Sequence, residues 1–370
     1  MKRGLFISHS GSLQGRPRGG VQICTEEYIS VIETAGITLQ FCLLDVDRRL
    51  STRIMRRFGV SSYLRPVEPD ALAKIASALQ DDPPELIFLN QVTLATLAPA
   101  IKQRESGNAR IVVLSHGLES TDLLHNARLQ HRLPLGTSAS LRPAKAIGAA
   151  LLAENALRAH VDCVVALSSF DVELERWLGA RRVDWLPRLV AADPLEWRPI
   201  GERLGFVGTL DHAPNMEGLV EVLNRLTSAD RRYAIRVVSA SSKVGKWLAE
   251  TFPNVDYLGP LPEDDLRREA ATWNVFLHPI FCYPRGCSTK LAIALGWHLP
   301  IVTTSMGHRG YELGAGCLVV ADDPSDFAAK CLRLLDTDAA QDARCGIINA
   351  ARAAPSLQEN AKRLQALLEN

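Results

Sequence analysis

The 370-residue chain lacks several features that mark specialised classes of protein. Its eight cysteines form no Cys-x-x-Cys pair, and Cys282 and Cys287 have no further ligand at metal-binding spacing, which favours reduced core thiols over a metal site. No apolar run approaches the ~18 residues that cross a membrane, and the first apolar stretch is too short for a signal peptide. The formal net charge of +1 gives no global attraction to nucleic acid. We therefore expect a cytoplasmic protein without nucleic-acid partners, soluble or at most bound to a membrane surface.

What the chain does have is a globular composition and a repeated pattern of short apolar runs and longer amphipathic segments. Hydrophobic residues make up 47% of the chain, which is enough for a large core. The expected strands are residues 4–8, 38–44, 86–90, 110–116 and 163–168, and then 204–208, 234–239, 255–258, 275–279, 301–304 and 317–320. The expected helices include 21–34, 69–80, 144–160, 215–226, 243–251, 263–272 and 288–296. Continuous apolar strands separated by helices indicate parallel sheets that are covered on both faces.

Two successive arrays of this kind predict an α/β protein with two Rossmann-like, doubly wound domains facing a cleft. We place the first domain at residues 1–187 and the second at 200–354, with a linker over 187–199 that contains three prolines. A terminal helix is expected in residues 355–370. Ligands of such sheets bind beyond the carboxyl ends of the strands, so the loops there are the candidates for chemistry.

The loop "YPRGCSTKLAIALG", residues 283–296, has the composition of an anion site. Ser288 or Thr289 can cap the helix that follows, whose first amides and positive dipole end would face the loop. Arg285 and Lys290 add two cations, and Gly286 lets a ligand approach the backbone. This combination suits a diphosphate best. The alternative is a capped helix with exposed basic residues.

Other loops carry weaker signals. Glycines 11, 15, 19 and 20 precede the helix that begins near residue 21, where backbone amides could meet a phosphate, although a plain surface loop is an equal alternative. His116 ends a strand and could exchange a proton or a hydrogen bond, or it could be structural. Gly208 could admit a phosphate or simply form a turn. We expect His212 to be exposed rather than catalytic, and the loop over 303–312 could also face the cleft.

A separate segment, "RRLSTRIMRRFG" at residues 48–59, carries five arginines and no acidic residue. At helical spacing Leu50, Ile54 and Phe58 share one face. Basic amphipathic helices of this kind dock on anionic membranes. The alternative is a solvated surface helix.

The second half of the chain resembles the donor-binding domain of GT-B glycosyltransferases of the family 4-like group, which are retaining and use nucleotide sugars. The stretches that carry this resemblance are "FVGTLDHAPNMEGL", "YLGPL" at 257–261 and "KLAIALGWHLPIVTTSMGHRGYE" at 290–312. The first half is similar only in outline, through a glycine-bearing loop after the first strand and a His-Gly at a strand end. The resemblance implies the GT-B fold for the whole chain, with the terminal helix crossing back to the first domain.

The resemblance also implies roles for individual residues. His116 would lie beside the transferred sugar, and Arg285 and Lys290 would stabilise the departing diphosphate without an essential metal or other cofactor. The implied donor-binding residues are Gly208 and Thr209 at the diphosphate, Leu258 and Gly259 at the base, Gly286, Ser288 and Thr289 around the phosphates, and Gly19 and Gly20 closing from the first domain.

The chain departs from the family pattern in two respects. The group often has two glutamates eight positions apart, and here these positions hold Arg285 and Ile293. Isoleucine cannot accept a hydrogen bond from the ribose, which costs about 1 to 3 kcal/mol if a buried hydroxyl is left unpaired. The basic residues that usually follow the glycine at position 208 are also missing, and Arg285 would supply the lost charge.

We therefore expect a retaining glycosyltransferase that moves a sugar from a nucleotide-diphosphate donor to a hydroxyl acceptor, in glycan or cell-envelope polysaccharide synthesis. The first domain would bind a glycan or lipid-linked acceptor, and the second would bind the donor. Two alternatives stay open. One is a catalytically degenerate protein that binds sugar nucleotides, and the other is a GT-B-like sugar-nucleotide epimerase.

Overall fold

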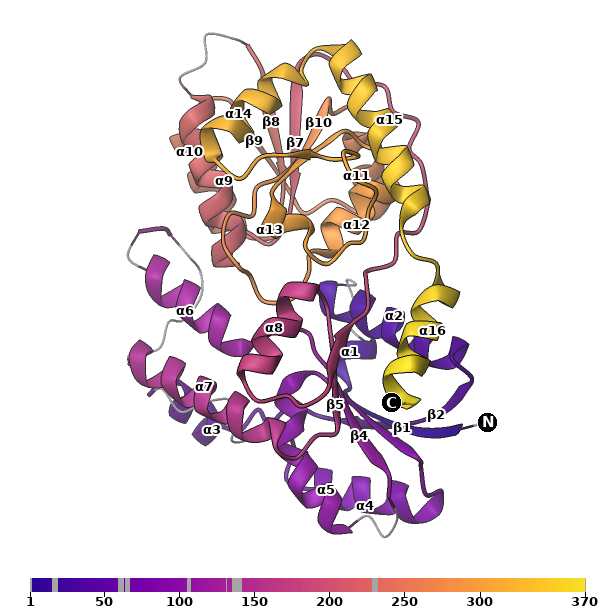
Figure 1. Cartoon of the computed structure of the whole chain (residues 1–370). Helices are drawn as coiled ribbons and strands as arrows, with labels where there is room; N and C mark the ends of the chain where they lie inside the picture. The colour runs from indigo at the N-terminus through magenta and orange to yellow at the C-terminus, as the bar shows by residue number, and fades with distance from the viewer. Residues whose placement is uncertain are drawn as a thin grey trace.

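The computed structural model describes residues 2–14, 19–58, 63, 67–104, 108–130, 132–134, 142–227 and 232–369. Two domains, each built on a six-stranded parallel sheet with helices on both faces, lie one above the other (Figure 1). The predicted α/β fold of two doubly wound domains is confirmed.

The N-terminal domain has the strand order β2-β1-β3-β4-β5-β6. These strands are β1 (Lys2–His9), β2 (Ile37–Leu44), β3 (Leu86–Asn90), β4 (Arg110–Leu114), β5 (Cys163–Ala166) and β6 (Val183–Trp185). Its helices are α1 (Gly11–Gln14), α2 (Gly20–Thr34), α3 (Leu50–Arg57), α4 (Ala71–Asp81), the 3-10 helix η2 (Val92–Leu97), α5 (Ala98–Arg104), α6 (Glu119–Leu129), α7 (Pro143–Arg158) and α8 (Ser169–Trp177).

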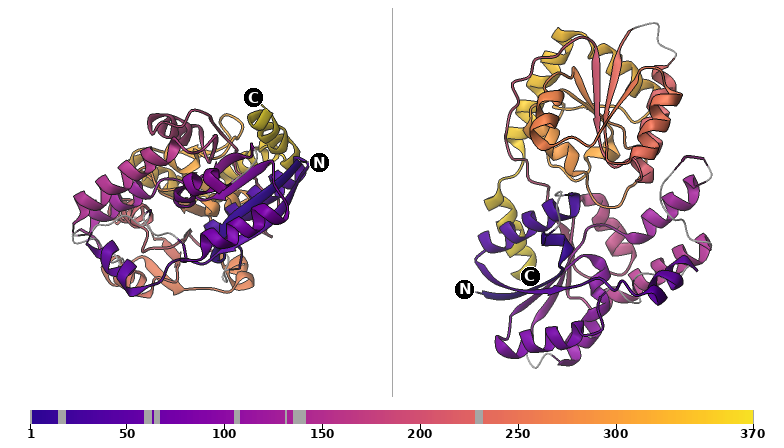
Figure 2. Two further views of the ribbon diagram at one scale, coloured as in Figure 1. Left: turned by 90° about the horizontal axis from the view of Figure 1, so that it is seen from below. Right: turned by 180° about the vertical axis from the view of Figure 1, so that it is seen from behind.

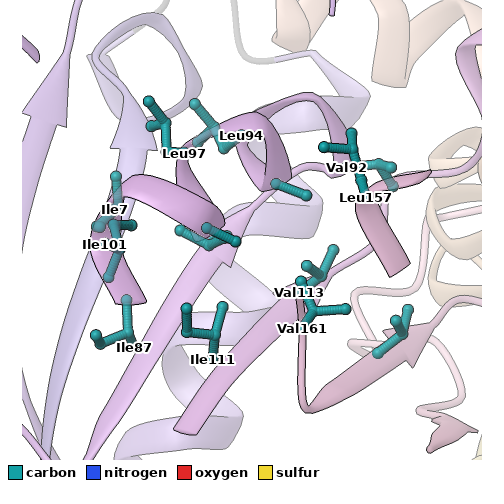
Figure 3. Packing of buried hydrophobic residues seen from close by; sticks show 14 of the residues in the cluster. Ile7, Ile87, Val92, Leu94, Leu97, Ile101, Ile111, Val113, Leu157 and Val161 are labelled. Carbon is teal, nitrogen blue, oxygen red and sulfur yellow. The ribbon is translucent and has the colours of Figure 1, made fainter. Parts of the chain in front are cut away.

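The two faces of this sheet are divided by strand alternation. Ile7, Ile87 and Ile111 point to one face, where they pack with Leu94 and Ile101 of η2 and α5 (Figure 3). The alternate residues of the same three strands point to the other face of the sheet, which α2 covers. Every residue of β3 is buried, as expected for a central parallel strand.

The C-terminal domain has the strand order β12-β11-β10-β7-β8-β9. These strands are β7 (Arg203–Val207), β8 (Ala234–Val238), β9 (Val255–Gly259), β10 (Val275–His278), β11 (Ile301–Thr303) and β12 (Val319–Val320). The helices are α9 (Ala213–Leu226), α10 (Ser242–Thr251), α11 (Glu263–Ala270), α12 (Thr289–Gly296), α13 (Ser305–His308), α14 (Pro324–Arg333) and α15 (Thr337–Ala353). Helices α9, α10 and α14 pack on one face of the sheet, and α11, α12 and α15 pack on the other.

The last helix, α16 (Leu357–Glu369), crosses back to the N-terminal domain and lies beside α2 (Figures 1 and 2). Leu364 and Leu368 join the buried cluster under α2. The side-chain amide of Asn360 donates to the carbonyl of Pro187 at 2.7 Å, next to the place where the chain first leaves this domain. The crossing that the resemblance implied is confirmed.

Candidate functional site

A cavity of about 560 Å³ lies between the two domains, at the carboxyl ends of their strands. Both domains contribute side chains to it, which makes it the candidate site. The N-terminal domain and the linker supply Gly20, Val21, Cys24, Gln91, His116, Asp122, Leu167 and Arg188. The C-terminal domain supplies Thr209, His212, Asn215, Ile280, Pro284, Arg285, Gly286, Cys287, Ser288, Thr289, Lys290, Gly307 and Arg309.

The loop at residues 283–288 is held in place from both sides of the cavity. The Tyr283 hydroxyl donates to the buried carboxylate of Asp171 on α8. The backbone carbonyl of Tyr283 lies 2.6 Å from Nε2 of His125. From its own domain, the guanidinium of Arg309 stacks 4.7 Å from the Tyr283 ring and donates to the carbonyls of Pro284 and Gly286. The loop conformation is thus fixed by both domains and is available to position a ligand.

Helix α12 begins at Thr289, and its first turn faces the cavity. Ser288 is the N-cap residue, but its side chain makes no capping hydrogen bond, contrary to the capping role that the sequence suggested for it. Further along, the amide of Ala292 donates to the hydroxyl of Tyr311, which in turn donates to the carbonyl of Ser288. The first amides of a helix have no partner inside it, so this end can receive an anion.

Lys290 is a cation without a carboxylate partner among the described residues. Its side chain is mostly buried, and its ammonium lies 5.9 Å from the ring centroid of Phe206. Burial lowers the pKa of Lys290 from 10.5 to about 8. A Cβ atom on Gly208 would lie 2.6 Å from the ammonium, so a larger residue there would displace the end of the Lys290 side chain from this position.

His116 is buried at the carboxyl end of β4, two residues beyond the strand that the sequence extended to it. Its Nε2 lies 2.8 Å from Oδ1 of Asn90. The side-chain amide nitrogen of Asn90 donates to the hydroxyls of Ser8 and Thr25, each at 2.9 Å, which identifies Oδ1 as the atom that faces His116. Nε2 therefore carries the proton, and Nδ1 is free to accept a hydrogen bond. Burial, together with Arg285, lowers the pKa of His116 to about 3, so the ring is neutral.

Arg285 and His212 each approach one oxygen of the Asp122 carboxylate. Nη1 of Arg285 lies 4.0 Å from Oδ2 of Asp122, and Nε2 of His212 lies 3.4 Å from Oδ1. Asp122 lies on α6 of the N-terminal domain, whereas the other two residues belong to the C-terminal domain. The three side chains thus place one carboxylate and one guanidinium in contact across the cavity.

The two domains also touch through glycines. A Cβ atom on Gly117 would overlap the backbone amide of Gly286, and both residues have positive φ angles. At the N-terminus of α2, a Cβ on Gly20 would lie 3.2 Å from the hydroxyl of Thr289. Gly20, which was expected to close over the donor, thus lies against the start of α12, and the predicted Gly15 lies outside the described residues.

The predicted site residues divide into two groups. The cavity is lined by Gly20, His116, Thr209, Arg285, Gly286, Ser288, Thr289 and Lys290. Gly19, Gly208, Leu258 and Gly259 are not among its lining residues, although Gly208 borders Lys290 and Gly19 precedes α2. Ile293 lies one turn further along α12 and is 40% exposed.

Sequence reasoning missed several cavity residues. Asp122 lies on a helix that was not predicted, and Arg188 lies in the segment that was taken for a linker. His212, expected to be merely exposed, lines the cavity. Gln91 also lines it and has a φ angle of 96°, an uncommon conformation for a residue with a side chain that often marks a functional position.

The described residues show neither a metal-binding cluster nor a membrane-spanning helix. They contain no cluster of three or more His, Cys, Asp or Glu side chains placed to hold a metal ion. None of the helices they form has the length and apolar character needed to span a bilayer.

The sequence of the C-terminal domain matches a known family. The model described as "Glycosyl transferases group 1" covers residues 201–337, from the start of β7 into α15. The C-terminal domain is thus similar in sequence to the group 1 glycosyltransferases. This confirms the resemblance that was carried by residues 204–312. No curated protein matches the chain.

Solved structures of glycosyltransferases share the fold of the whole chain. Sucrose-phosphate synthase from Thermosynechococcus elongatus matches 100% of this chain and 98% of its own, with a TM-score of 0.66 and 13% identity. HepE from Anabaena, solved with UDP and glucose, matches 100% of both chains, with a TM-score of 0.64 and 12% identity. The lipopolysaccharide outer core galactosyltransferase WaaB matches 100% of both chains, with a TM-score of 0.60 and 14% identity. At these identities the likeness establishes the fold, which is GT-B.

Proposed function

We propose that this protein is a glycosyltransferase that transfers a sugar from a nucleoside diphosphate sugar to a hydroxyl acceptor, in the synthesis of a glycan or cell-envelope polysaccharide. The observation that carries the proposal is the ammonium of Lys290 at the start of α12, which faces the interdomain cavity and has no carboxylate partner in the described part of the chain. A mostly buried cation without a counter-charge is unfavourable, and a diphosphate would supply that charge. The complex of HepE with UDP and glucose supports the choice of ligand.

In the proposed reaction the bond between the sugar and the diphosphate breaks, and the departing oxygen keeps the bonding electron pair. Lys290, Arg285 and the first amides of α12 would stabilise the charge that develops there. The acceptor oxygen forms the new bond to the sugar, and its proton passes to the departing diphosphate oxygen. His116 is neutral, so it would orient the sugar by accepting a hydrogen bond at Nδ1 rather than act as an acid.

The finer parts of the proposal follow the resemblance. The C-terminal domain would bind the donor and the N-terminal domain the acceptor, and the transferred sugar would keep its anomeric configuration. Two cations and the helix amides would supply the positive charge, with no metal required. All eight cysteines are free thiols, which supports a cytoplasmic location. We propose that the protein also associates with the inner face of the membrane.

A second candidate is a catalytically degenerate protein that binds sugar nucleotides. Ile293 is the observation that favours it, because an exposed isoleucine occupies the position from which a carboxylate would bind the ribose. A GT-B-like epimerase is the third alternative, and it would need acid and base groups on either side of the sugar. In the described lining of the cavity Asp122 is the only carboxylate, which makes this alternative the weakest.

Calorimetric titration with UDP, GDP, ADP and their sugar conjugates tests the proposal. Binding of one nucleoside diphosphate, together with slow hydrolysis of its sugar conjugate, is the expected result. Binding without hydrolysis would favour the degenerate protein, and interconversion of donor sugars would favour the epimerase. Absence of binding by every nucleotide would contradict the proposal. For an active donor, NMR of the product anomer would test retention.

A further inference from the structure

Helix α3 exposes the apolar side chains that a surface helix normally buries. Leu50 and Ile54 of α3 and Phe58, which directly follows the helix, are spaced four residues apart and are 69%, 48% and 48% exposed. Residues at this spacing lie on one face of a helix. A soluble domain usually turns such a face toward its core, so in α3 the usual orientation is reversed.

The opposite face of α3 is fixed to the domain. Thr52 is 3% exposed, and its hydroxyl donates to Oδ2 of Asp47 at 2.8 Å. The Asp47 carboxylate also accepts hydrogen bonds from the backbone amide of Arg49 at 3.0 Å and from its guanidinium at 2.9 Å. These hydrogen bonds, led by that of the Arg49 side chain, hold the pKa of Asp47 well below its usual range. The first turn is therefore held with Thr52 inward, and the apolar stripe stays outward.

Cations border this apolar stripe. Arg53 lies three residues after Leu50, and Arg57 lies three residues after Ile54, so both flank the stripe. Arg48, Arg53 and Arg57 are exposed, and none forms an ion pair with a described residue. The adjacent carboxylate, that of Asp47, is occupied by Arg49. The surface thus combines exposed hydrocarbon with guanidinium groups that have no counter-charge among the residues that the structure describes.

We propose that the outward face of α3, defined by Leu50, Arg53, Ile54, Arg57 and Phe58, docks on an anionic membrane surface. A bilayer interface supplies both partners that this face lacks, since acyl chains accept the apolar side chains and headgroup phosphates pair with arginine. A protein partner could cover the apolar stripe, but it would also have to bring acidic groups in register. The combination of hydrocarbon and unpaired arginine favours the lipid surface.

The position of α3 is compatible with such docking. It lies on the N-terminal domain, on the side away from α16 and from both chain ends (Figures 1 and 2). Docking would hold the proposed acceptor domain against the bilayer, where a lipid-linked acceptor would lie. The inference itself does not depend on the proposed function, because binding to vesicles requires no sugar donor.

Co-sedimentation of the full chain with vesicles tests the inference. Vesicles of phosphatidylcholine alone and vesicles that also contain phosphatidylglycerol are compared at low and high salt. We expect binding to the anionic vesicles at low salt, with a marked loss at high salt because headgroup charge is screened. Arg53→Gln and Arg57→Gln should each lower the partition coefficient about fivefold. Ile54→Ser should lower it as well, on neutral and anionic vesicles alike.

Matched controls separate this surface from general stickiness. Ile200, which directly follows the linker and is 56% exposed, serves as the control for Ile54, and the exposed Arg333 on α14 serves for Arg53. Ile200→Ser and Arg333→Gln should leave vesicle binding unchanged. Absence of binding to anionic vesicles at low salt would overturn the inference, as would equal losses in the control variants. Light scattering that shows a dimer abolished by Ile54→Ser, without vesicle binding, would assign the face to a second copy instead.

Discussion

Two of the cations that line the cavity are in opposite electrostatic situations. Arg188, where the linker leaves the N-terminal domain, is 2% exposed and makes a bidentate pair with Glu27 at 2.6 and 2.8 Å. Lys290, on the C-terminal domain, has no carboxylate partner among the described residues, and burial lowers its pKa to about 8. The paired cation is already satisfied by the protein, whereas the unpaired one retains its charge for a ligand. The comparison separates a side of the cavity where the cation is structural from a side where we propose that an anion binds.

The largest effect is expected where the paired cation is removed. Arg188→Met should lower the free energy of unfolding by about 3 kcal/mol, because it leaves the Glu27 carboxylate without its buried partner. Urea unfolding measures this change. Arg198→Met is the control, since its pair with Glu196 is exposed on both sides and should contribute less than about 1 kcal/mol. Equal effects of the two substitutions would remove the distinction between a buried structural pair and a surface one.

Removing the unpaired cation should affect binding rather than folding. Lys290→Met should weaken binding of the preferred nucleoside diphosphate by about 2 kcal/mol, or thirtyfold, since charge-assisted hydrogen bonds to phosphate are lost. The variant should be at least as stable as the parent, because an unfavourable buried charge is removed. Calorimetry gives the affinity, and Lys246→Met on the exposed face of α10 is the control. A loss of stability without a loss of affinity would contradict the assignment.

The pH dependence follows from the lowered pKa of Lys290. Between pH 8 and the ordinary lysine value the folded protein holds fewer protons than the unfolded chain, so the stability of the ligand-free protein should rise with pH there. Affinity for the diphosphate should change in the opposite direction, falling by up to tenfold per pH unit above pH 8 as the ammonium deprotonates. Lys290→Arg should abolish this fall because arginine stays charged. An unchanged pH profile in that variant would assign the titration to another group.

Arg285 tests whether the cavity distinguishes the two phosphates. Arg285→Ala should weaken binding of the nucleoside diphosphate about fivefold and leave the monophosphate nearly unaffected, because only the second phosphate would reach this guanidinium. Titrations of both nucleotides measure the ratio. Equal losses for the two ligands would argue against a role for Arg285 at the diphosphate.

The smallest effect is expected at Asp122, the carboxylate that contacts Arg285 across the cavity. Asp122→Asn should tighten nucleoside diphosphate binding about twofold to threefold, since a long and partly exposed ion pair competes only weakly with a phosphate. Calorimetry at two ionic strengths measures this effect, which should shrink at higher salt. Weaker binding in this variant would mean that Asp122 helps to position the ligand rather than competing with it.

The sequence predicts the fold more completely than the site. Buried strands such as 86–90 are continuous apolar runs, and the loop at 285–290 concentrates glycine, hydroxyl and cationic residues, so both could be found without coordinates. The three-residue strand Val183–Trp185 is too short to stand out from its surroundings. Arg188 follows a proline in a segment of mixed polarity, and only the partner 161 positions away shows that it is buried. The burial of such residues depends on contacts between elements that are distant in sequence, and no local sequence pattern predicts these contacts.

The chain passes between the domains twice, through residues 187–199 and between α15 and α16, on the same side of the molecule (Figures 1 and 2). Two neighbouring crossings restrict the domains to rotation about the line that joins them. The widest separation during opening then falls on the far side, where Arg128 of α6 pairs with Glu217 of α9. Entry and release of ligands should therefore begin with the parting of this ion pair, while the region around Asn360 stays almost still.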